Sequence, residues 1–357
     1  MTEDQTADYE IGDLERRAAD LQKAGLMNSA RDAVGELDTT LSQLPARLQE
    51  ARTRGYVFKS YLEEKLESLQ GQWRSVRGNV NREIERRARE LGDDLEKAEQ
   101  AVRRLAPYKG RALSSAQSSI NRAESELDSL ERRIDAASEA VSGMYETIQS
   151  EMWDASREVD ECVDLLDLMD KASFGFRPGE VGVAAVRAKW LKDGRKEGPK
   201  GILFLTDQRI IFEQREKVAK KKVLFITTAS EEVQELQWEA PLGTLQEAEA
   251  SEQRKAIVVK KEHLTLSFKP PATIREVLME LSADSDTWRA LINRVLSGEI
   301  DRERVEGAKE EAVAEAAAVT VPSNCPNCNA KLDITVTRGM TAVKCTFCGT
   351  SIPLTGG

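Results

Sequence analysis

The residues best placed to do chemistry in this sequence are four cysteines near its C-terminal end. They form two Cys-x-x-Cys pairs, Cys325 with Cys328 and Cys345 with Cys348, and sixteen residues separate the pairs. Two thiolates on each of two tight turns supply four soft ligands, which is the tetrahedral set that Zn²⁺ prefers. The spacing therefore predicts one structural zinc ion held by these four side chains.

The sequence between the pairs predicts a β-hairpin. Apolar and polar residues alternate from 332 to 337, and a glycine-containing turn follows. Asn329 and Gly349, each directly after the second cysteine of a pair, are types that tolerate the positive φ such a turn needs. The stretches CPNCNAKL and CTFCGTSI closely resemble the zinc ribbon family over Asn324 to Leu354.

Other chemistries for the four cysteines are less favoured. A redox dithiol requires a sizeable α/β domain around it, and a segment of about 35 residues has no room for one. Spacing alone leaves a four-cysteine iron–sulfur cluster open. A catalytic zinc is disfavoured because protein ligands fill all four positions. Without metal such a unit cannot fold, so about 10–16 kcal/mol of metal binding is its folding free energy.

Length and charge bound the rest of the chain. A chain of 357 residues predicts two or three domains. Its formal net charge of −10 argues against general affinity for nucleic acid or anionic lipid. The acidic N-terminus resembles no secretory signal, and no apolar run approaches the ~18 residues of a membrane span. We expect a cytoplasmic protein, peripheral to a membrane at most.

Residues 1–172 predict long helices that form a coiled coil. Apolar residues recur every seven positions from Leu113 to Met169, with a second apolar series between them, which makes an a/d seam roughly 85 Å long. The segment before Pro107 has the same spacing, with one residue skipped near Glu83. We expect an antiparallel hairpin with its tip near residues 107–110. Whether the seam closes within one chain or in a homo-oligomer stays open.

Residues 173–299 predict an antiparallel sheet closed by a helix from Asp284 to Leu296, because the apolar period changes there from seven to two. The predicted strands are Val181–Leu191, Gly201–Leu205, Arg209–Gln214, Val223–Ala229, Val233–Ala240, Ala256–Lys261 and Leu264–Lys269. This plan, the stretch GILFLTDQRIIFEQ and Trp288 resemble the pleckstrin-homology (PH) superfamily, in particular its GRAM branch. The resemblance implies a module that binds lipids or proteins and does not catalyse. The single histidine, His263, is predicted to be a surface strand residue.

A local excess of basic residues lies in the same module. Between Arg187 and Lys222 the sequence holds twelve basic and five acidic residues. The candidate anionic-ligand patch consists of Lys192, Arg195, Lys196, Lys200, Lys220, Lys221 and Lys222. Such a patch can meet anionic headgroups, but it can equally be a solvated face or dock onto an acidic helix of the same protein.

The remaining segments are a spacer and the ribbon. Residues 300–321 are rich in alanine and glutamate, which predicts a semi-rigid helical spacer, and residues 322–357 hold the zinc ribbon. The expected fold class is thus multidomain α+β: a coiled-coil hairpin, an antiparallel PH/GRAM-like domain and a small zinc ribbon.

The chain shows no phosphate-binding glycine loop, no metalloprotease motif and no credible triad, so we expect no catalysis. The favoured hypothesis is a non-enzymatic scaffold whose ribbon contacts a protein partner. One alternative is nucleic-acid binding through the ribbon, disfavoured by its few basic residues. Another is a coiled-coil protein of membrane stress or remodelling, which needs a lipid-facing helix. The N-terminal run Ile11, Leu14, Ala18 and Leu21 is a weak, acidic candidate for one.

Overall fold

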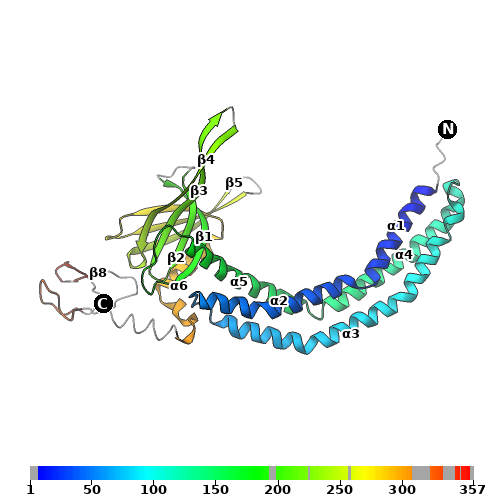
Figure 1. Cartoon of the computed structure of the whole chain (residues 1–357), viewed down its shortest axis with the longest axis horizontal. Coiled ribbons are helices and arrows are strands. Elements are labelled where there is room, and N and C mark those ends of the chain that lie inside the picture. Colours follow the sequence, from blue (N-terminus) through cyan, green and yellow to red (C-terminus); the bar gives the residue numbers. More distant parts are fainter. Residues whose placement is uncertain are drawn as a thin grey trace. The chain divides into compact units, whose positions relative to one another are not determined.

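The structure is a computed structural model, and it describes residues 7–192, 198–223, 226–255, 259–307, 322–332, 342–345 and 347–353. The chain divides into two compact units (Figure 1). One comprises Met1–Arg47 with Glu63–Arg157, and the other comprises Leu48–Leu62 with Glu158–Gly357. None of the helices in the described ranges combines the length and the apolar character that a membrane span requires.

The first unit is helical. Its helices are α1 (Asp8–Gly25), α2 (Asn28–Thr53), α3 (Tyr61–Arg103), α4 (Leu113–Ser142) and α5 (Glu146–Asp170). One end each of α2, α3 and α5 belongs to the second unit. A short 3₁₀ turn, η1 (Ala106–Tyr108), joins α3 to α4 at the predicted hairpin tip. The predicted seam forms the buried face of α4, where Ile120, Leu127 and Val141 are at most 1% exposed.

The apolar seam packs against helices of the same chain. The sequence had left open whether its partner helices come from the same chain or from another copy. Trp73 of α3 donates from Nε1 to Asp38 Oδ1 of α2 at 3.1 Å, and Arg17 of α1 donates to Asp128 Oδ1 of α4 at 2.7 Å. Ile11 and Leu14 of α1 are 0% and 4% exposed. The N-terminal run considered as a lipid-facing helix therefore packs in this helical core.

The prediction of an uninterrupted helix from Leu113 to Met169 is wrong at residues 143–145, where the helix is broken. Residues 143–145 form a turn between α4 and α5, in which Tyr145 N donates to Ser142 O at 3.0 Å. Met144, which the heptad pattern placed in the seam, is 36% exposed, and Tyr145 is 5% exposed instead. Gly143 starts the break, consistent with its low helix propensity.

The second unit contains a seven-stranded antiparallel sheet. Its strands are β1 (Gly182–Trp190), β2 (Lys200–Thr206), β3 (Arg209–Val223), β4 (Ile226–Pro241), β5 (Leu245–Lys255), β6 (Val259–Phe268) and β7 (Glu276–Leu281). They lie side by side in the order β4-β3-β2-β1-β7-β6-β5. Seven strands followed by one helix, α6 (Ser285–Leu296), agree with the predicted α+β plan.

Several strand assignments differ from the prediction. The two segments expected over 223–229 and 233–240 lie largely in one long strand, β4, and those expected over 256–261 and 264–269 lie largely in β6. The sequence missed β5 and β7. β5 is an edge strand rich in Glu, Gln and Ala, and such polar edge strands lack the β-branched signal. β7 has only six residues.

Helix α6 covers the sheet as its sequence predicts. Asp284 caps it, because its Oδ1 accepts from Thr287 N at 2.7 Å. Trp288 and Ile292 are 6% and 0% exposed. His263 is a strand residue of β6, as predicted, but the predicted surface position is wrong: β5 and β7 flank its strand, and His263 is 5% exposed with Nε2 4.0 Å from Glu280 Oε2.

The first residues of the predicted spacer are packed in the second unit. Ile300 and Arg304 are 4% and 2% exposed, in and just after a 3₁₀ turn, η4 (Glu299–Glu303). Val305 N donates to Val57 O at 2.9 Å, and Ser60 N donates to Glu303 O at 2.8 Å. Residues 308–321 of the spacer lie outside the described ranges.

Candidate metal centre

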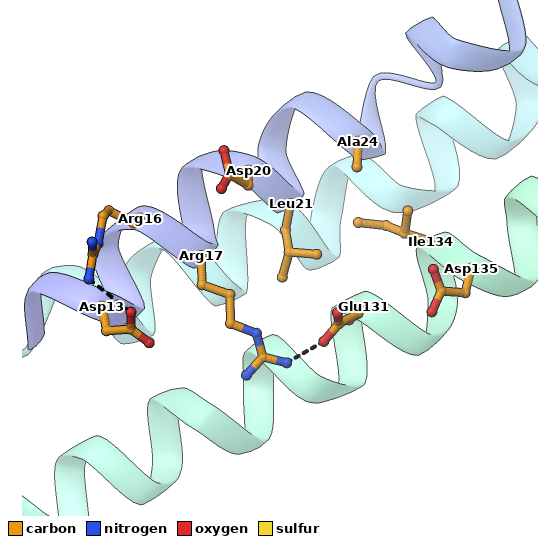
Figure 2. Close-up of a pocket in the computed structure, with 9 residues that line it drawn as sticks. All are labelled: Asp13, Arg16, Arg17, Asp20, Leu21, Ala24, Glu131, Ile134 and Asp135. Atoms are coloured by element: carbon orange, nitrogen blue, oxygen red, sulfur yellow. Dashed lines mark hydrogen bonds and ion pairs between the residues drawn. The ribbon is translucent and has the colours of Figure 1, made fainter. Parts of the chain in front are cut away.

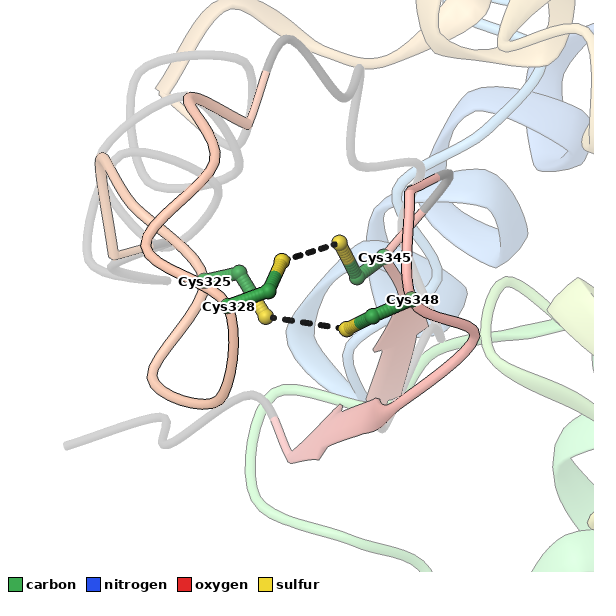
Figure 3. Close-up of side chains that lie close together, drawn as sticks. All are labelled: Cys325, Cys328, Cys345 and Cys348. Atoms are coloured by element: carbon green, nitrogen blue, oxygen red, sulfur yellow. Dashed lines mark hydrogen bonds between the residues drawn. The ribbon is translucent and has the colours of Figure 1, made fainter.

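The first cysteine pair lies on a tight turn held by its own backbone. Cys325 N donates to Ala330 O at 2.8 Å, and Asn329 N donates back to Cys325 O at 2.8 Å. Asn329 has a φ of 57°, which confirms the prediction of a left-handed residue after the second cysteine. These bonds aim both thiols of the pair to the same side of the turn (Figure 3).

The second pair repeats the first. Cys345 N donates to Thr350 O at 2.9 Å, Gly349 N donates to Cys345 O at 2.9 Å, and Gly349 has a φ of 70°. Two short strands, β8 (Ala342–Lys344) and β9 (Ser351–Pro353), pair antiparallel beside this turn. The two turns are thus equivalent in hydrogen bonding and in backbone conformation.

The four sulfur atoms converge on one point. Cys325 Sγ lies 3.6 Å from Cys348 Sγ, Cys328 Sγ lies 3.6 Å from Cys345 Sγ, and all four lie within 4.8 Å of one another (Figure 3). Tetrahedral Zn²⁺ with Zn–S bonds of about 2.3 Å requires S–S separations of roughly 3.8 Å. The four thiols therefore fit a metal ion of this size and could hold one.

Hydrogen bonds lower the proton affinity of one thiol. The hydroxyl and the backbone amide of Thr350 lower the pKa of Cys348 to about 5, and Cys328 contributes to the shift. The backbone amide of Ala330 lowers the pKa of Cys328. Hydrogen bonds from the Cys328 thiol to Cys348 and the other cysteines outweigh this effect, and the pKa of Cys328 rises to about 12. Four adjacent thiolates repel one another, so full ionisation requires a bound cation.

Two polar residues that the sequence reasoning missed support the cluster. Asn327, between the first two cysteines, donates from Nδ2 to Thr350 Oγ1 at 2.9 Å and lies 3.7 Å from Cys348 Sγ. Thr350 Oγ1 lies 3.3 Å from the same sulfur. One turn is thereby tied to the other through side chains. Such supporting partners orient ligands in metal sites, and only the folded geometry shows that they meet.

The fifth cysteine belongs to another part of the second unit. Cys162 of α5 is 1% exposed and its thiol donates to Glu158 O at 3.0 Å, as the heptad interpretation of a core residue expects. Burial raises the pKa of this thiol, which disfavours the reactive thiolate.

The candidate basic patch is described only in part. Lys192 places its Nζ over the Trp190 ring, 5.2 Å from the centroid, and Lys200 begins β2 with its amide donating to Glu216 Oε1 at 3.2 Å. Arg195 and Lys196 lie outside the described residues. Lys220, Lys221 and Lys222 are described as backbone positions of β3.

Two larger cavities show no catalytic arrangement in their described lining. In the helical unit, a groove of about 640 Å³ lies between α1 and α4 (Figure 2), and its Arg17 is neutralised by Asp128 and Glu131. In the second unit, a cleft of about 860 Å³ lies between α5, β1 and α6, over apolar residues that include Leu165 and Trp288. The described residues that line either cavity include no histidine.

Comparison with known proteins gives no family. No protein-family model matches the chain, and no curated protein matches it significantly. Solved structures align along its length with low similarity. A structure of the Vav1 exchange factor concerned with its PH and C1 domains is 9% identical, covers 94% of this chain and 97% of that chain, and has a TM-score of 0.23.

Two further structures are comparable. Autoinhibited Vav1 is 11% identical over 99% of this chain and 71% of that chain, with a TM-score of 0.27. The DH/PH domains of p115-RhoGEF are 15% identical over 77% of this chain and 98% of that chain, with a TM-score of 0.21. At these scores the alignments do not establish a common fold, so the functional inference rests on the chain itself.

Proposed function

We propose that this protein is a non-enzymatic, zinc-binding scaffold. Its helical coiled coil sets the distance between bound partners or assembles copies of the chain. Its PH/GRAM-like module recruits a lipid or protein ligand, and its zinc ribbon contacts a protein partner in the cytoplasm. The observation that carries the proposal is the convergence of four cysteine sulfurs from two equivalent turns.

The donor set supports a structural role for the ion. Zinc that activates water keeps one coordination position open, whereas here four cysteines would fill every position. Cys325 and Cys345 are 1% and 2% exposed, so half of the cage is shielded from solvent. The ion would supply folding free energy to residues 322–353, whose described part contains few buried apolar side chains.

An exposed aromatic residue supports protein contact by the ribbon. Phe347, between the cysteines of the second pair, is 74% exposed on a turn whose backbone is fixed by two hydrogen bonds. Rigid, exposed aromatic residues are frequent anchors of protein interfaces. Nucleic-acid binding is less favoured, because Asn324 to Gly357 contain only three basic residues, Lys331, Arg338 and Lys344.

The sheet supports the PH/GRAM-like assignment of the middle module. Its seven antiparallel strands and the capping helix α6 match the plan that the sequence resembles. Modules of this plan use the sheet as a support for ligand-binding loops, and fold alone does not specify the ligand.

Metal analysis combined with limited proteolysis tests the zinc part of this proposal. We expect one zinc per chain, lost in Cys345→Ser and retained in the matched control Cys162→Ser. Trypsin should cut at Lys331, Arg338 and Lys344 only after chelation or in Cys345→Ser, because the metal-free ribbon unfolds. Full zinc content in Cys345→Ser would contradict the assignment. If the purified protein contains iron and shows the visible absorption of an iron–sulfur cluster, the site is an iron–sulfur site and the zinc assignment is wrong.

A further inference from the structure

The four cysteine thiols differ in their access to solvent. Cys325 and Cys345, the first cysteines of the two turns, are 1% and 2% exposed. Cys328 and Cys348, the second cysteines, are exposed. Oxidation of cysteine depends on thiolate character and on exposure. An oxidant that arrives from solvent therefore meets Cys328 or Cys348 first.

Each exposed thiol has a buried thiol of the opposite turn beside it. Cys348 Sγ lies 3.6 Å from Cys325 Sγ, and Cys328 Sγ lies 3.6 Å from Cys345 Sγ (Figure 3). The sulfurs of a disulfide are about 2.05 Å apart, so each pair has to close by roughly 1.5 Å. A sulfur that is oxidised at the surface thus has a reaction partner on the other turn.

A contact that does not involve the ion also joins the two turns. Asn327 Nδ2 donates to Thr350 Oγ1 at 2.9 Å and lies 3.7 Å from Cys348 Sγ. While the remaining thiolates still bind the ion, this contact helps to keep Cys348 beside the first turn. Reaction across the cluster can therefore occur before the turns separate.

We propose that hydrogen peroxide converts the cysteine cluster into two cross-turn disulfides, Cys325–Cys348 and Cys328–Cys345, and thereby releases the zinc ion. The ribbon is then an oxidant-responsive switch. Disulfides are rare in the reducing cytoplasm, where those that form are mostly transient or redox-sensing. The switch deepens the zinc-binding role proposed above for the ribbon and rests on it.

The reaction balances with peroxide as the oxidant. The Cys348 thiolate attacks one peroxide oxygen, the O–O bond breaks, and a sulfenic acid and a hydroxide ion form. The Cys325 thiolate then attacks the oxidised sulfur, the S–S bond forms and a second hydroxide ion leaves. The two sulfurs lose two electrons, the two peroxide oxygens gain them, and two protons from solvent convert the hydroxide ions to water. The second pair consumes a second peroxide in the same way, and Zn²⁺ leaves with its charge unchanged.

The connection between the cysteines decides what oxidation does to the ribbon. Cross-turn disulfides hold the first turn to the second, as the zinc ion does, so the oxidised ribbon should keep its fold without metal. Disulfides within each Cys-x-x-Cys pair would leave the two turns unconnected. The metal-free ribbon would then unfold as it does after chelation.

Peroxide treatment of the zinc-loaded full chain tests the switch. Remaining thiols are alkylated in acid, released zinc is measured with a chromogenic chelator, and disulfides are mapped by mass spectrometry of peptides. We expect complete release of zinc, the two cross-turn linkages, and the loss of two hydrogen atoms for each disulfide. Trypsin, which should cut the chelated ribbon, should leave the oxidised ribbon intact.

Histidine substitutions separate the two sulfur pairs. They keep a zinc ligand at the substituted position, because three cysteines and one histidine also form a structural zinc site. Cys348→His should form only the Cys328–Cys345 disulfide, and the matched variant Cys345→His should form only Cys325–Cys348. Cys162→Ser should form both, since Cys162 is buried in α5.

Three results would overturn the inference: disulfides within each Cys-x-x-Cys pair, sulfinic acids without disulfides, or retention of zinc at a peroxide concentration that fully oxidises free cysteine. If a histidine variant loses its zinc, the disulfide map of the wild type still decides. Zinc content before treatment tests the metal site separately. A chain that binds zinc but resists peroxide would refute the switch and leave the zinc proposal intact.

Discussion

Removing the Arg304 side chain should strongly destabilise the second unit. Arg304 and Asp207 are each 2% exposed at the side chain, and Arg304 Nη2 lies 2.7 Å from Asp207 Oδ2. The guanidinium also lies 4.6 Å from the centroid of the Phe58 ring, and Arg304 Nε donates to Asp301 Oδ1 at 2.6 Å. One side chain therefore joins the β2–β3 turn, the α2–α3 connection and the segment after α6.

The magnitude follows from what the substitution leaves behind. In Arg304→Met the packing volume is largely kept, but the Asp207 carboxylate stays buried without its cation. Breaking a buried pair in this way costs roughly 3–5 kcal/mol. Asp207 Oδ1 still accepts from Val181 N at 3.0 Å, so we expect a value near 3 kcal/mol, the lower limit of that range.

A double-mutant cycle isolates the pair. Adding Asp207→Asn to Arg304→Met removes the buried charge, keeps an acceptor for Val181 and should restore about 1–2 kcal/mol. Urea unfolding followed by tryptophan fluorescence measures each variant, and Arg302→Met, two residues away on an exposed position, is the control. A loss in Arg304→Met no larger than in Arg302→Met would refute the role of the buried pair.

Three further predictions concern the cysteine cluster. Zinc affinity should rise with pH, because protons compete with the ion for the thiolates, and the slope should become shallower above about pH 5, where the Cys348 thiol is mostly ionised and no longer releases a full proton on binding; a chelator competition series measures this, and a flat profile would contradict it. Gly349→Ala should weaken zinc binding about tenfold, since a left-handed conformation costs an L-residue roughly 1–2 kcal/mol, whereas Asn329→Gly should change affinity little. Asn327→Ala should weaken zinc binding about tenfold by removing the Thr350 contact, measured by the same competition, and equal affinity would show that the contact does not orient the ligands.

Local sequence patterns predicted the features that depend on neighbours in the chain. Each cysteine turn closes within five residues, so Asn329 and Gly349 revealed its backbone conformation in advance. A heptad period likewise identifies which face of a helix is buried. The cap at Asp284 and the closing helix α6 belong to the same class, because a few adjacent residues encode them.

Distant partners were beyond the reach of such patterns. The seam did not reveal that α1 and α2 cover it, and the heptads ran through Gly143 without showing the break that exposes Met144. β5 has no apolar alternation, so only its pairing with β6 identifies it as a strand. His263 directly follows the charged residues Lys260, Lys261 and Glu262, but its strand lies between two others and the residue is buried.

The helical period, the change to a β-rich module and the two Cys-x-x-Cys pairs could be predicted without coordinates, because a few neighbouring residues encode each of them. Only the folded chain shows that the two cysteine turns meet through Asn327 and Thr350, that Arg304 pairs with Asp207, and that the pairing of β3 with β4 extends beyond that of β2 with β3. These contacts join residues many positions apart, and the free energy that selects them comes from burial and pairing in the folded chain.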